Sequence, residues 1–91
     1  MKIRAMVTIT GLVQGVAFRQ STQQTAQRLN VCGWVKNLPD GSVQGCFEGE
    51  ETDVETLIGW CHEGPSRAEV SGVNVKKEPF SGQFESFRIS Y

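Results

Sequence analysis

The hydrophobic period of this chain changes along its length, and that change limits the folds it can adopt. Between Ile3 and Ile9 every second residue is apolar, and this alternation is typical of a strand with one buried face. From Phe18 the period becomes helical, at Phe18, Thr22, Ala26 and Leu29. We therefore predict a helix over residues 19–30, ending at Asn30, because Asn tolerates the left-handed conformation of a helix cap.

A hairpin and a second helix follow. Residues 33–37 and 42–48 are predicted strands, and the segment Leu38-Pro39-Asp40-Gly41 between them is typical of a tight turn. Thr52-Asp53-Val54-Glu55 has the spacing of a capping box, which marks a helix start. The apolar stripe of this helix contains Val54, Leu57, Ile58 and Cys61. Gly64-Pro65 is expected to end the helix, because Pro continues a helix poorly.

Two more strands complete the pattern. Residues 68–75 form the first, and the apolar positions change parity between Val70 and Val73, which indicates a bulge. The last strand contains the alternating residues Phe87, Ile89 and Tyr91. The order β-α-β-β-α-β, with one possible extra strand, predicts an α+β, ferredoxin-like sandwich, with two helices on one face of a mainly antiparallel sheet of four to five strands. With 91 residues, we expect a single domain over residues 1–91.

Charge and cysteine content narrow the class of protein. The formal net charge is -1, which argues against nucleic-acid binding because that needs a basic face. No apolar run is long enough to span a membrane and no signal peptide is visible, so we expect no membrane partner and a cytoplasmic location. Three scattered cysteines favour reduced thiols, although the sequence leaves a Cys32–Cys46 bridge open.

The segment between the first strand and the first helix is the candidate for chemistry. It reads Gly11-Leu12-Val13-Gln14-Gly15-Val16-Ala17-Phe18-Arg19. The N-terminus of a helix offers unpaired N–H groups and a favourable dipole to an anion. Gly15 allows a tight turn that gathers amides into one concavity, and Arg19 can add a planar fork for phosphoryl oxygens. From the residues alone, an ordinary β-α connection and an anion site are both open.

Two motifs resemble the signatures of the acylphosphatase family. The first is Gly11-x-Val13-Gln14-Gly15-Val16-x-Phe18-Arg19, and the second is Gly33-Trp34-Val35-x-Asn37-x-x-Asp40-Gly41. Further similarity at Glu48-Gly49, at Gly64-Pro65 and at the terminal Phe87-x-Ile89-x-Tyr91 extends the resemblance over essentially the whole chain. Asn30 departs from the Gly usual in relatives, which should cost little because Asn also adopts left-handed conformations.

The resemblance implies a hydrolase that cleaves the carboxyl-phosphate bond of acyl phosphates. It implies that Arg19 and the backbone amides of Gly15, Val16, Ala17, Phe18 and Arg19 bind the phosphoryl group, and that Asn37 positions the attacking water. Such a reaction depends on positioning and charge stabilisation, and a carboxylate leaves readily without a strong acid. We therefore expect no cofactor and no metal, with an acyl phosphate and inorganic phosphate as ligands of a monomer. From the residues alone, Asn37 could equally serve only to shape the hairpin.

Three other interpretations compete with this one. Cys61-x-x-Gly64-x-x-Arg67 resembles the phosphate loop of cysteine-dependent phosphatases, but its Cys ends a helix instead of a strand. A non-catalytic anion-binding module is the second, because the hydrogenase-maturation carbamoyltransferases begin with a similar domain and loop. We expect the free enzyme, because the chain ends at Tyr91 without zinc-finger cysteines. An RNA-binding sheet is the third, but only Phe47 on the central strands suggests it.

Overall fold

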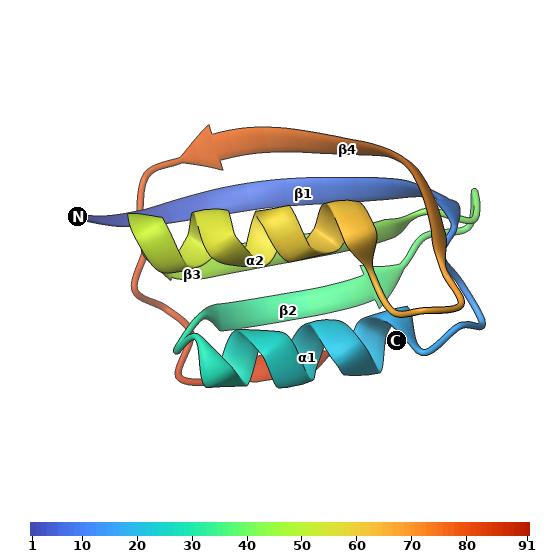
Figure 1. Cartoon of the computed structure of the whole chain (residues 1–91). Helices are drawn as coiled ribbons and strands as arrows, with labels where there is room; N and C mark the ends of the chain where they lie inside the picture. Colours follow the sequence, from blue (N-terminus) through green and yellow to red (C-terminus); the bar gives the residue numbers. More distant parts are fainter.

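The computed structural model describes residues 1–91 and contains five strands and two helices (Figure 1). The strands are β1 (Lys2–Leu12), β2 (Cys32–Asn37), β3 (Val43–Glu50), β4 (Glu69–Glu78) and β5 (Phe87–Ile89). The helices are α1 (Phe18–Arg28) and α2 (Glu51–Glu63). Neither helix is long and apolar enough to cross a membrane.

The five strands form one sheet in the order β4-β1-β3-β2-β5. All neighbouring pairs are antiparallel except β2 and β5, which run parallel. Both helices cover the same face of this sheet, with α2 over β1, β3 and β4 and α1 over β2 and β5 (Figure 1). The predicted ferredoxin-like α+β sandwich is therefore confirmed, and β5 is the fifth strand.

The core lies between the sheet and the helices. It includes the fully buried alternating residues of β1, namely Ala5, Val7 and Ile9, together with the stripe that was predicted for α2. On α1 the buried residues are Phe18, Thr22, Thr25 and Ala26. Thr22 and Thr25 are accommodated because each hydroxyl donates to the backbone carbonyl four residues earlier, at 2.8 Å. Phe47 packs against Phe87 inside this core, so it cannot stack RNA bases on the open face.

The bulge and the hairpin are as predicted, but the start of α2 is not. Opposite β1, the register shifts between Thr10 and Gly11, so that Ser71 of β4 is left without a partner. At α2, no side chain caps the helix, and Thr52 and Glu55 do not form the predicted capping box. The strand β3 runs directly into the helix, and the Glu51 N–H donates to the Met1 carbonyl at 2.9 Å. A tertiary contact thus replaces the local cap.

The hairpin between β2 and β3 is closed by its own side chains. The Leu38 N–H donates to the Ser42 carbonyl at 2.8 Å. Asp40 accepts from both the backbone N–H and the hydroxyl of Ser42, at 2.9 and 2.6 Å. These bonds favour the carboxylate, the Ser42 hydroxyl most strongly, and so lower the pKa of Asp40 below its ordinary value of 3.8. The turn that follows Asn37 is therefore held by a charged group.

We expect the contribution of Asp40 to stability to depend on pH. Because its folded pKa is lowered, this contribution should be complete above the unfolded value of 3.8 and should fade as pH falls through the folded value. The measurement is thermal unfolding of the wild type and Asp40→Ala at neutral pH and near pH 2.5. The difference in Tm should shrink at the acidic pH. A difference that stays constant between the two conditions would contradict the charged-acceptor role.

Candidate active site

One pocket brings together most of the residues that were expected to act. It has a volume of about 370 Å³ and lies where the start of α1 meets the ends of β2 and β5. Its lining residues are Val13, Gly15, Ala17, Phe18, Arg19, Gln20, Gln23, Asn37, Ile89 and Tyr91. Val16 is not among them, and it packs against the hydrophobic core. Gly15, Arg19 and Asn37 thus share one cavity although they come from two separate segments.

The start of α1 presents free backbone donors to this pocket. Ala17 precedes the helix with a φ of 63°, and no side chain caps the helix. The first hydrogen bond of the turn is from the Ser21 N–H to the Ala17 carbonyl, and the N–H groups of residues 15–20 have no acceptor in the protein. Gly15 has a φ of 75° with open space around the position of a Cβ, so its conformation and not crowding calls for glycine. Such a run of unpaired amides is suited to an anion.

Arg19 supplies the positive charge of the pocket. It takes part in none of the ion pairs of the structure, so no carboxylate neutralises it. Its Nη1 lies 3.4 Å from the Ser90 carbonyl, and its guanidinium lies 5.0 Å from the centre of the Tyr91 ring. These contacts orient the guanidinium without cancelling its charge.

Asn37 contributes a buried and unpaired acceptor. It is the last residue of β2, and its Oδ1 has no hydrogen-bond partner in the protein. An unpaired buried acceptor lowers the stability of the folded state by about 1–3 kcal/mol, so its presence calls for an explanation. Asn37 also lines the pocket, so its side chain lies beside any phosphoryl group or water that the pocket holds.

Two glutamines hold the walls of the pocket together. Gln14 donates through Nε2 to the carbonyls of Leu38 and Ser42, at 2.8 and 2.9 Å, and so ties the loop before α1 to the hairpin that carries Asn37. Gln23 donates to the Phe87 carbonyl at 3.0 Å and ties α1 to β5. The sequence alone predicts no role for either glutamine. Only the place of Gln14 within the first motif could have indicated its importance.

The segment that resembles a cysteine phosphatase loop lies elsewhere. Cys61 is fully buried near the end of α2, and neither it nor Arg67 lines the pocket. Burial raises the pKa of the Cys61 thiol to about 12, so it carries no thiolate near neutral pH. All three cysteines are free, and Cys46 lies opposite Trp34 while Cys32 lies opposite Glu48. No group of three or more His, Cys, Asp or Glu side chains is placed to hold a metal ion.

We expect Cys32 to be the one thiol that reacts readily in the folded protein. It is half-buried, whereas Cys46 and Cys61 are fully buried, and burial raises the pKa of both. Titration with a chromogenic disulfide at pH 8 should therefore consume about one thiol under native conditions and all of them in denaturant.

Cys61→Ala should retain turnover in the folded state. Loss of turnover in a folded Cys61→Ala protein would restore the thiol as a nucleophile.

The chain is similar to known proteins in both sequence and fold. A family model described as Acylphosphatase matches residues 5–89. An acylphosphatase from Geotalea uraniireducens is 66% identical over 91 residues, which is 100% of both chains. The solved structure of an acylphosphatase from Coxiella burnetii is 38% identical, with a TM-score of 0.93 over 98% of this chain and 93% of that one. Full-length HypF in a phosphate- and nucleotide-bound form aligns with a TM-score of 0.86 and 28% identity, over 100% of this chain but 12% of that one.

Proposed function

The chain belongs to the acylphosphatase family and is an acylphosphatase, and from this premise we propose how its own residues hydrolyse an acyl phosphate. The observation that supports the proposal best is the shared pocket of Gly15, Arg19 and Asn37. In this proposal the pocket holds the phosphoryl group and the attacking water, and the products are a carboxylate and inorganic phosphate.

Arg19 and the amides of residues 15–19 bind the phosphoryl oxygens. The guanidinium bears a charge that no carboxylate offsets, and the amides have no other acceptor. Charge-assisted hydrogen bonds from such donors are shorter and about twice as strong as neutral ones. Since the same oxygens carry the charge in the transition state, these donors stabilise both bound substrate and transition state.

Asn37 positions the water that attacks phosphorus. Its Oδ1 accepts one O–H of the water, which leaves an oxygen lone pair free to face the phosphoryl group. As the water oxygen bonds to phosphorus, the bond from phosphorus to the acyl oxygen breaks and the carboxylate leaves with that electron pair. The proton of the water passes to a phosphoryl oxygen of the substrate. No imidazole or carboxyl side chain lines the pocket, and a carboxylate needs no acid to leave.

The substrate range tests this proposal. We expect the protein to hydrolyse benzoyl phosphate at the same rate with and without a chelator, and to leave p-nitrophenyl phosphate nearly untouched. The physical reason is that the pocket offers an alkoxide or phenoxide leaving group no carboxyl or imidazole acid. The measurement is initial rates on both substrates, with and without EDTA. Inhibition by the chelator, or a preference for the monoester, would overturn the proposal.

A further inference from the structure

The connection between β4 and β5 crosses the whole sheet, and one buried carboxylate holds its centre. The strands β4 and β5 lie at opposite edges of the sheet, and β3 is the middle strand. Residues 79–86 therefore pass from edge to edge, at the end of the sheet that is far from the C-terminus (Figure 1). None of these eight residues is buried, so hydrophobic packing contributes little to their position.

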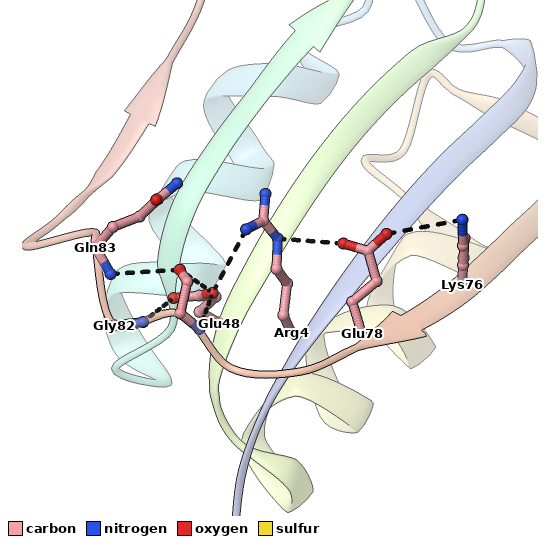
Figure 2. A network of polar contacts seen from close by, with 7 residues as sticks. Arg4, Glu48, Lys76, Glu78, Gly82 and Gln83 are labelled. Atoms are coloured by element: carbon pink, nitrogen blue, oxygen red, sulfur yellow. Dashed lines mark hydrogen bonds and ion pairs between the residues drawn. The ribbon is translucent and has the colours of Figure 1, made fainter.

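Glu48 of β3 binds the midpoint of this connection. Its side chain is only 2% exposed. It accepts hydrogen bonds from the Ser81 N–H at 2.9 Å, from the Ser81 hydroxyl at 2.7 Å and from the Gly82 N–H at 3.1 Å (Figure 2). Arg4 lies 4.0 Å from the same carboxylate and 3.4 Å from Glu78, so the buried charge of Glu48 is paired. A buried carboxylate with so many partners fixes a segment firmly.

Cations from β1 hold the residues on either side. The Lys2 ammonium lies 5.5 Å from the centre of the Phe80 ring, and the Arg4 guanidinium lies 5.8 Å from that of Phe84. Such contacts are weak at an exposed site and tolerate sliding. The three hydrogen bonds to Glu48 are therefore the contacts that fix residues 81 and 82 of the connection most directly.

The position of β5 in turn sets one wall of the pocket. The strand pairs with only three residues of β2, Gly33–Val35, and the Ser90 N–H continues the pairing to the Val35 carbonyl at 2.8 Å. Ile89 and Tyr91 then line the pocket, and the Ser90 carbonyl accepts from Arg19. Within β5, Phe87 is buried against Phe47, and the Ser86 carbonyl accepts from the Gly33 N–H at 3.0 Å, so the strand is held by these contacts together with the connection that leads into it.

We propose that Glu48 is a positioning residue for the reaction, which acts through residues 81–91 on the orientation of Arg19. The inference rests on the phosphate-binding role proposed above for Arg19. It assigns to Glu48, at the opposite end of the sheet from the pocket, the task of holding the Ser90 carbonyl and the Tyr91 ring against the guanidinium.

Glu48→Gln tests the proposal, because it keeps the volume but places an amide NH₂ among donors. In the folded variant, the Kd for inorganic phosphate and the KM for benzoyl phosphate should each rise about tenfold, since small displacements of a binding group have large effects. The Ser90 amide should also exchange faster with solvent, while the amide of Leu57 in α2 should not. Ser81→Ala removes one of the three bonds without threatening the fold, and should shift the Kd in the same direction by about twofold to threefold.

Val54→Ala is the matched control, because it weakens the core under α2, a helix that packs mainly against β1, β3 and β4. It should lower Tm at least as much as Glu48→Gln and leave the phosphate Kd unchanged. If Glu48→Gln lowers only Tm while Arg19→Ala abolishes phosphate binding, the positioning role is wrong and the phosphate-binding role stands. If Arg19→Ala keeps its phosphate affinity, the proposed function itself fails.

Discussion

Arg19→Ala is expected to lower kcat/KM by an amount equivalent to about 2–5 kcal/mol of lost transition-state stabilisation, and to weaken the binding of inorganic phosphate as well. The variant removes the one unneutralised cation among the residues that line the pocket. Because Arg19 is proposed to contact the phosphoryl group before and during the reaction, both the bound state and the transition state should lose the interaction. The measurements are steady-state kinetics on benzoyl phosphate and a phosphate titration followed by NMR.

Arg19→Lys separates charge from geometry in the same assay. Lysine keeps the positive charge but lacks the planar fork, so it should recover only a small part of the lost affinity. In the wild type, the titration should shift the amides of residues 15–19 and the side chain of Asn37. Shifts centred on residues 64–67 would move the anion site to the cysteine segment and refute the assignment of Arg19.

Asn37→Ala should fail in a different way, with kcat reduced by about a hundredfold and phosphate affinity nearly unchanged. The proposed partner of its Oδ1 is the attacking water and not the phosphoryl group. Stability should change little or increase slightly, because removing an unpaired buried acceptor removes a cost. The measurements are kcat, the phosphate Kd and Tm on the same preparation.

Asn37→Asp is the informative companion variant. It retains an acceptor oxygen but adds a negative charge beside a phosphoryl site, so it should weaken phosphate binding where Asn37→Ala does not. If instead Asn37→Ala loses as much phosphate affinity as Arg19→Ala, then Asn37 contacts the phosphoryl group and the water-positioning role is wrong.

Much of this fold could be read from local patterns. The alternation in β1, the Asp40-Gly41 turn and the parity change near Ser71 each follow from a few neighbouring residues, and all three are confirmed. The start of α2 could not be predicted this way. There the Met1 carbonyl accepts a hydrogen bond from the Glu51 N–H at the start of the helix. The residues around Glu51 give no sign of a contact with a residue so distant in the chain.

The candidate site, like the fold, could be predicted from the sequence only in part. Arg19 and Asn37 could be singled out because they lie in two motifs, and the pocket brings them together. The bridge from Gln14 to the hairpin and the contacts of Arg19 with residues 90 and 91 could not be predicted, because they join segments far apart in the chain. Ala17 is a further case, since nothing in the sequence indicates that a non-glycine residue takes a φ of 63° there.

The bulge in β4 also affects whether another strand can add to the edge of the sheet. A sheet edge with free N–H and C=O groups is a template for another strand, and proteins resist this with short, bulged or charged edges. Here one edge, β5, has only three residues. The other, β4, has ten, but it carries the bulge at Ser71 and the exposed Lys76 and Lys77. Both edges are thus poor templates for the addition of a strand from a second chain.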